Sequence, residues 1–301
     1  MKQRLKIMTI VVLVIVDLIA ITLAVRHSSQ MPPASVSSKV PLTSTPSSAK
    51  TTTPPPEAAS PTGLSVVGNS IGRFAAGTCD GTGSAKLEVS ADGGSTFAEV
   101  ALPLAAKTTA GGKQATAVAR ILSLDLASAT EMTLIGDSAA CKPSSWTTSD
   151  AGKSWKQASS SSDWYIDGNK VGTLAGEVDS GCEPVSVAAV SDRNAKVACK
   201  DSKIRGTDDA GQTWVALGSL DGVVSVSFET VANGVAVAKT SKCAAQSYST
   251  GSAGGSWQET GCIDTKTPAS AIGGTSALLA ALVGPKTLVS VDQGATWKEA
   301  Q

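Results

Sequence analysis

Four aspartates of this chain recur in one octapeptide, Ser/Thr-x-Asp-x-Gly-x-Thr/Ser-Trp/Phe. They are Asp92, Asp150, Asp209 and Asp292, and a fifth copy carries Ser252 at the aspartate position. Carboxylates at a fixed spacing could act as acid–base groups or metal ligands. Here each Asp is followed two residues later by Gly, which is typical of a tight turn whose carboxylate accepts backbone N–H bonds. We therefore predict that these aspartates close hairpins and neither catalyse a reaction nor bind a metal.

The last position of the octapeptide holds a large aromatic residue. It is Phe97 in the first copy and Trp155, Trp214, Trp257 and Trp297 in the others. A ring at the start of the strand that leaves a turn offers apolar area to bury between neighbouring sheets. We predict that these rings belong to the core and form no ligand platform.

The sequence contains few other residues or motifs that could support catalysis or bind a cofactor. The only histidine is His27, and no Cys-x-x-Cys, Gly-x-Ser-x-Gly or phosphate-binding glycine loop occurs. The 25 Lys and Arg residues balance the 25 Asp and Glu residues, so no global positive charge favours nucleic acid. We expect no cofactor, no metal and no nucleic-acid partner.

Short strands surround each octapeptide. One set is Val185 to Val190, Ala195 to Lys200, Ile204 to Asp209 and Thr213 to Leu217. Such repeated four-stranded units are typical of propeller blades. The third positions of the five copies are 58, 59, 43 and 40 residues apart, which predicts an all-β propeller of about five four-stranded blades over residues 63–301. A sixth blade would fit if Ala105 to Ala115 or Asp163 to Glu177 held further strands, and how the ring closes stays open.

The octapeptides resemble the Asp-box of sialidase-type and BNR-repeat β-propellers, from about Gly63 onward. For a sialidase, the resemblance implies three arginines that grip a carboxylate, a Tyr nucleophile assisted by a Glu, and an Asp acid/base. The segment from Ile71 to Phe74 departs from the family's Phe/Tyr-Arg-Ile-Pro signature. The candidates available beyond residue 62 are Arg73, Arg120, Arg193, Arg205, Tyr165 and Tyr248. We therefore expect no enzyme, and sialidase-like glycoside hydrolysis is the alternative.

Similar Asp-box propellers include photosystem II assembly and stability factors and sortilin-type receptors, which hold protein or peptide partners. That resemblance implies a non-catalytic binding or assembly module for a protein or a cell-envelope glycan. A structural spacer in the envelope is a further alternative. Polar residues expected at the ends of the innermost strands are Asp125, Glu131, Asp192, Arg193, Asn194, Glu229 and Asn233. The most polar tip is Asp192-Arg193-Asn194, which is either a partner-binding site or a simple type I turn.

All six cysteines lie beyond the linker, which fits an oxidising compartment. Cys182 and Cys199 flank an inner hairpin and make one candidate pair. Cys243 and Cys262 enclose the copy that lost its Asp, where a disulfide could replace the missing turn contact. Cys79 and Cys141, at equivalent places in successive repeats, remain as the third pair by elimination. The positions of the cysteines relative to the repeated octapeptide, which we call the repeat phase, favour this pairing, and other connectivities stay open.

The first 62 residues differ in composition. Residues 1–26 contain a basic start and an apolar run from Ile7 to Val25 that is interrupted by Asp17, a length that predicts one transmembrane helix. A cleaved signal peptide is the alternative. Residues 27–62 are rich in Pro, Ser and Thr and predict a disordered tether. We expect an exported bacterial protein in the cell membrane, single-pass, with a cytoplasmic N-terminus and the propeller outside.

Overall fold

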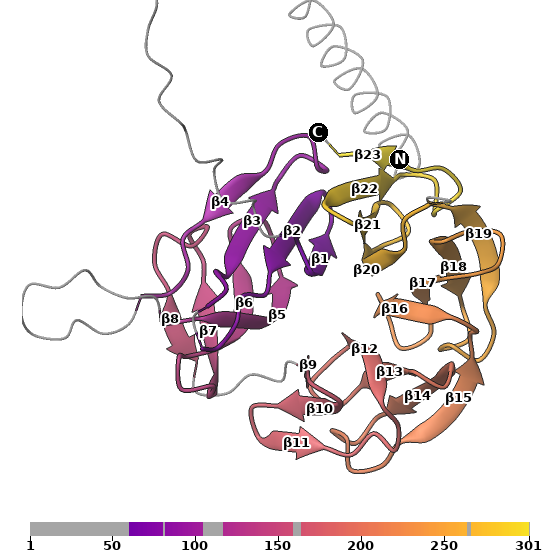
Figure 1. The fold of residues 1–301 in the computed structure, drawn as a ribbon, viewed down its shortest axis with the longest axis horizontal. Helices are drawn as coiled ribbons and strands as arrows, with labels where there is room; N and C mark the ends of the chain where they lie inside the picture. The colour runs from indigo at the N-terminus through magenta and orange to yellow at the C-terminus, as the bar shows by residue number, and fades with distance from the viewer. Residues whose placement is uncertain (1–59, 81, 105–116, 159–163, 264–265, 301) are drawn as a thin grey trace, which may run out of the picture. The chain divides into compact units, whose positions relative to one another are not determined.

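The computed structural model describes residues 60–80, 82–104, 117–158, 164–263 and 266–300, all within one compact unit, Pro56–Gln301. These residues form six antiparallel sheets arranged as blades around an axis (Figure 1). The predicted all-β propeller is confirmed, with six blades in place of about five. The predicted anchor and nearly all of the tether lie outside the described residues. Within the described part, no helix is long and apolar enough to cross a membrane.

Five blades have four strands, ordered from the axis outward as they occur in the chain. Blade 1 contains β1 (Gly63–Val67), β2 (Ser70–Ala75), β3 (Lys86–Ser90) and β4 (Ala98–Val100). Blade 2 contains β5 (Arg120–Leu126), β6 (Met132–Asp137), β7 (Pro143–Thr148) and β8 (Lys156–Ala158). Blade 4 contains β12 (Pro184–Ala189), β13 (Ala195–Cys199), β14 (Lys203–Thr207) and β15 (Val215–Ser219). Blade 5 contains β16 (Val223–Phe228), β17 (Gly234–Ala238), β18 (Gln246–Thr250) and β19 (Gln258–Cys262). Blade 6 contains β20 (Ala269–Gly274), β21 (Leu279–Val283), β22 (Lys286–Ser290) and β23 (Lys298–Glu299).

Among the described residues, blade 3 has three strands, β9 (Tyr165–Asp167), β10 (Lys170–Thr173) and β11 (Gly176–Val178). They lie in one of the two segments that the sequence left open for a sixth blade. The other segment, 105–115, lies outside the described residues. Blade 3 also lacks an octapeptide turn, which is why the spacing between two copies is long there.

The octapeptide turns all lie on one face of the ring, which we call the box face. Each joins the third strand of its blade to the fourth. The loop between the first two strands lies beside it, and in four blades a backbone N–H of the turn donates to that loop. These bonds are Gly93 N to Asn69 O, Ala151 N to Thr130 O, Ala210 N to Arg193 O and Ala253 N to Ala232 O, at 2.8–3.0 Å.

Three disulfides lie on the opposite face, which we call the disulfide face. Cys79 pairs with Cys141, Cys182 with Cys199 and Cys243 with Cys262. These are the pairs that the repeat phase favoured. The first joins two neighbouring blades through their loops between second and third strands.

Packing between adjacent blades builds the core. Buried apolar side chains fill the interfaces between blades 1 and 2, 3 and 4, 4 and 5, 5 and 6, and 6 and 1. Because each sheet is covered on both sides, a second strand such as β21 is buried along its whole length. Arg120 of blade 2 pairs with Asp137 of its own blade and with Asp167 of blade 3, so the second ion pair joins these two blades.

The ring closes by side-chain packing between blades 6 and 1. Ile71 packs with Leu278, Ala280 and Val289, and Arg73 Nη1 donates to Thr287 Oγ1 at 3.0 Å. The four described strands of blade 6 follow one another in the chain, and no described strand from the N-terminal part of the propeller joins this sheet.

Candidate functional site

The turn of Asp209 shows how the octapeptide closes. Thr207 Oγ1 donates to Asp209 Oδ1 at 2.8 Å and accepts the Gly211 N–H at 3.0 Å. The Thr213 N–H donates to Oδ1 at 2.9 Å, and its hydroxyl donates to Oδ2 at 2.6 Å. The same contacts close the turns of Asp92, Asp150 and Asp292. Hydroxyl and then backbone hydrogen bonds lower the pKa of all four carboxyls to about 2. Each carboxylate is therefore occupied within its own turn.

The copy that lacks Asp is closed by a shorter side chain. Ser252 Oγ accepts the Ser256 N–H at 2.9 Å and lies 2.9 Å from the Ser256 hydroxyl. The disulfide Cys243–Cys262 lies at the other end of this hairpin, beside the pair Gln246 and Cys262 of β18 and β19. Ser252 itself therefore makes a contact in this turn, and that the disulfide compensates for the lost aspartate stays a prediction.

The aromatic residues of the octapeptides pack between blades. Trp214 meets Trp164 edge to face at 5.8 Å between ring centroids, and Trp257 meets Phe228 at 6.0 Å. The remaining two tryptophans donate their indole N–H to backbone carbonyls: Trp155 to Ala101 at 2.7 Å and Trp297 to Gly294 at 3.0 Å. Phe97 lies under the Arg73 guanidinium at 3.8 Å.

The four arginines of the described part make separate structural contacts. Arg73 pairs with Glu88 at 2.8 Å, and Arg120 with Asp137 and Asp167. Arg205 Nη1 donates to Ser180 O at 2.6 Å, and Arg193 Nε to Asp208 O at 3.3 Å. The arginine cluster that a sialidase-like site requires is therefore not assembled among the described residues.

The two tyrosines are also apart. Tyr165 lies on β9 at the axis and donates to Thr173 O at 3.3 Å. Tyr248 lies on the third strand of blade 5, where it lines a separate hollow with Trp257. Burial first, and then the Glu259 carboxylate, raise the pKa of Tyr248.

The tip Asp192-Arg193-Asn194 forms the exposed loop between β12 and β13 on the box face. Ser191 Oγ accepts the N–H groups of Arg193 and Asn194 at 3.3 and 3.1 Å. Arg193 binds the neighbouring turn through the Asp208 carbonyl. The three residues lie outside the wall of the central cavity.

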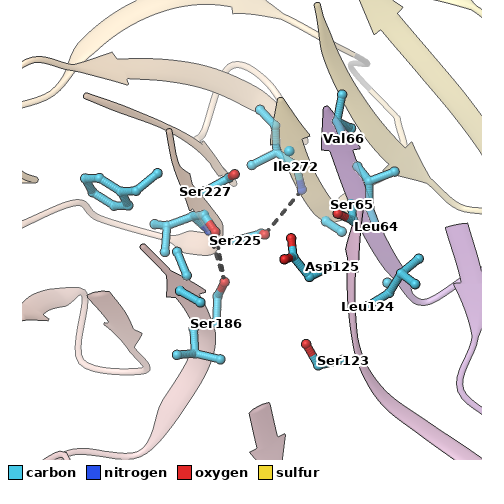
Figure 2. A pocket seen from close by; sticks show the side chains of 18 of the residues that line it. Leu64, Ser65, Val66, Ser123, Leu124, Asp125, Ser186, Ser225, Ser227 and Ile272 are labelled. Atoms are coloured by element: carbon cyan, nitrogen blue, oxygen red, sulfur yellow. Dashed lines mark hydrogen bonds between the residues drawn. The ribbon is translucent and has the colours of Figure 1, made fainter. Parts of the chain in front are cut away.

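A cavity of about 590 Å³ lies on the ring axis. The innermost strands of all six blades line it with aliphatic side chains and serine hydroxyls (Figure 2). Asp125 and Glu229 are the only charged side chains among its described lining residues, and both are acidic. Of the other polar residues expected at the axis, Glu131 lines a separate hollow of about 280 Å³.

Serines of the innermost strands join neighbouring blades. Ser65 Oγ accepts the N–H of Leu126 at 3.1 Å. Ser186 Oγ accepts that of Val226 at 3.1 Å, and Ser225 Oγ that of Ile272 at 3.2 Å (Figure 2). In β5, β12 and β16 the serine follows a register shift, so these β-bulges aim equivalent side chains along the wall.

Sequence reasoning missed this serine set, although a signal exists. Each serine stands between two aliphatic residues on an innermost strand. The four tripeptides are Leu64-Ser65-Val66, Leu122-Ser123-Leu124, Val185-Ser186-Val187 and Val224-Ser225-Val226. A hydroxyl repeated at one place in an apolar strand indicates a polar partner at that place.

No family model matches the chain, and no curated protein matches it. Solved structures are similar at low identity. YCF48 bound to D1 peptide is 20% identical over 81% of this chain and 69% of that chain, with a TM-score of 0.31. YCF48 from Cyanidioschyzon merolae is 13% identical over 78% and 68%, with a TM-score of 0.34. The GH74 xyloglucanase from Xanthomonas campestris is 15% identical over 80% and 38%, with a TM-score of 0.32. We transfer no residue role from any of them.

Proposed function

We propose that the propeller is a non-catalytic binding module that holds a segment of a protein partner in its central cavity. The observation that carries this proposal is the wall itself, which combines aliphatic side chains, serine hydroxyls and two carboxylates around about 590 Å³. Apolar lining with a few placed polar groups is the usual composition of a binding cavity. The carboxylates of Asp125 and Glu229 favour a partner segment that carries positive charge.

A protein partner fits the wall better than a glycan does. The aromatic side chains at the cavity are Phe74, Trp164, Tyr165 and Phe228, and their exposed fractions are 8%, 2%, 6% and 6%. Their ring faces are packed against the core and offer no platform on which a sugar could stack. Backbone and aliphatic groups of a peptide match the serines and valines of the wall.

We also propose that residues 1–26 anchor the chain in the membrane and that residues 27–62 carry the propeller outside the cytoplasm. The three disulfides support an oxidising location. The mass of membrane-extracted chain should include Lys2, and external protease should reach the propeller. A mature chain that begins near Arg26 would identify a cleaved signal peptide.

The binding proposal is tested with the purified full-length chain and a library of random linear peptides. Ser227 lines the cavity, and Ser227→Trp should abolish binding by filling space there. Val215, 58% exposed on the outermost strand of blade 4, gives the matched control Val215→Trp, which should bind normally. Among selected peptides, those with Lys or Arg should weaken on Asp125→Asn and Glu229→Gln, and more so at low salt.

Two results would contradict the proposal. One is a set of peptides that bind the wild type and the Ser227→Trp chain equally. The other is hydrolysis of aryl glycosides that disappears in Asp125→Asn or Glu229→Gln while the melting temperature stays constant, because this would identify a glycosidase.

A further inference from the structure

Lys196 is the one lysine among the described residues that is buried, with 7% of its surface exposed. It lies on β13 beside Ala195, which pairs with Thr207, the first residue of the blade 4 octapeptide. In the other blades that carry an octapeptide the equivalent residue is uncharged: Gly72, Thr133, Val235 and Ala280. The fold therefore does not require a charge at this place.

The Lys196 side chain lies on the side of blade 4 that packs against blade 5. Ala198, two residues along β13, belongs to the apolar cluster between these two blades. The partner of Lys196 on β14 is Gly206, where an added Cβ would meet Lys196 Nζ at 3.0 Å and Leu217 Cδ1 at 2.8 Å. Blade 6 has Val289 at the equivalent place. The glycine of blade 4 thus leaves room for the lysine side chain.

No counter-ion holds the ammonium of Lys196. It forms no hydrogen bond and no ion pair with any described residue; burial lowers its pKa, and the exposed carboxylate of Asp208 opposes this only in part. The facing turn of blade 5, residues 250–257, contains no charged residue, and a Cβ added at its Gly254 would meet Ile204 Cγ2 at 2.9 Å. Buried charges in proteins are usually paired, so this one indicates a missing anion.

The ammonium is within reach of solvent. Lys196 Nζ is not among the sealed side-chain nitrogens without a partner, which include Nε1 of Trp214 and of Trp257. Lys196 and Gly206 each lie one residue from the end of their strand at the box face, so Nζ is closest to that face. With 7% of the residue exposed, only a small group can approach it.

We propose that Lys196 forms a second binding site, between blades 4 and 5, that takes the carboxylate of a small organic acid. The carboxylate accepts hydrogen bonds from the ammonium and neutralises its charge. Leu217 gives the site an apolar wall that suits a short aliphatic tail. The nearby charge of Asp208 disfavours acids with a second negative charge. The site is separate from the central cavity and from the function proposed for it.

The experiment uses the purified full-length chain, labelled with carbon-13 at lysine Cε, and acetate as the probe. The nuclear magnetic resonance signal of Lys196 should shift saturably with acetate at constant ionic strength. Its titration midpoint should move to higher pH, because a bound carboxylate favours the charged amine. Acetamide, which has a similar shape and no charge, should bind at least about tenfold more weakly.

Three variants locate the effect. Lys196→Met keeps an aliphatic stem and removes the charge, so it should lose acetate binding without a fall in melting temperature. The matched control Lys203→Met, at an exposed lysine of β14, should bind acetate as the wild type does. Asp208→Asn removes a repelling charge and should tighten acetate binding about twofold at low salt, a gain that structural damage would not produce.

Several results would overturn the proposal. If chloride and acetate shift the Lys196 signal equally and without saturation, the lysine only extends its ammonium to solvent and no site exists. If acetate binding persists in Lys196→Met, or is weaker in Asp208→Asn, the carboxylate binds elsewhere. If Lys196→Met does not fold, the comparison of acetate, acetamide and chloride on the wild type decides alone. None of these results affects the function proposed for the cavity.

Discussion

The two faces of the ring are held together by different chemistry. On the box face, hydroxyl and backbone N–H groups surround a carboxylate, as at Asp209. On the disulfide face, three cystines join loops and strand ends. The first device is local, because it connects residues four positions apart. The second constrains long loops and depends on oxidation, so the two faces should respond to different perturbations.

The largest effect is expected from the disulfide face. Cys79 and Cys141 are separated by 62 residues, so replacing both by Ser should cost about 4 kcal/mol of unfolding free energy in the chain-entropy model. The matched control is Cys243→Ser with Cys262→Ser, whose 19-residue separation gives about 3 kcal/mol. Urea unfolding measures both. If removing Cys79–Cys141 cost less unfolding free energy than removing Cys243–Cys262, chain entropy would not explain how these disulfides stabilise the fold.

The next effect concerns the aromatic residue behind a turn on the box face. Trp214→Ala removes a ring that packs edge to face on Trp164, and we expect a loss of about 3 kcal/mol. Trp214→Phe keeps most of the apolar area and should lose less than half as much. Equal losses in both variants, measured by urea unfolding, would mean that ring packing is not what Trp214 contributes.

A smaller effect should distinguish the two kinds of turn on the box face. Asp209→Ala should lower the melting temperature by about 2–4 °C, and Ser252→Ala by about half as much, because serine closes its turn with fewer bonds. Ser252→Asp should raise it by about 1–2 °C. Differential scanning calorimetry measures the three melting temperatures. A lower melting temperature for Ser252→Asp than for the wild type would contradict the equivalence of the two turns.

The smallest effect is the dependence on pH. The pKa of Asp209 is about 2 in the folded chain, lowered from 3.8. A lowered folded pKa gives stability that is complete above the unfolded pKa and is lost as pH falls through the folded one. The difference in melting temperature between wild type and Asp209→Ala should therefore be constant above about pH 4 and shrink toward pH 2. A difference that changes between pH 5 and 8 would assign the effect to another group.

The sequence predicted what is local and repeated. An octapeptide turn is specified by its own side chains, so the hairpins at Asp92 or Asp292 follow from spacing alone. The disulfide partners follow because equivalent places in a repeat come together. Blade 3 has neither an octapeptide nor a cysteine pair within its strands, so only the structure shows that β9, β10 and β11 form a separate sheet. The serine contacts were missed because Ser186 and Val226 meet only when two blades pack.

The closure of the ring allows the chain to be rearranged. Because blades 6 and 1 meet through buried apolar side chains such as Ile71 and Val289, that junction is of the same kind as the junctions of blades 1 and 2 or of blades 4 and 5. A propeller in which residue 300 is joined to residue 60 by a linker and whose new ends lie between β15 and β16 should fold to the same ring. Circular permutation can thus place an attachment point at a chosen blade boundary and leave the cavity wall unaltered.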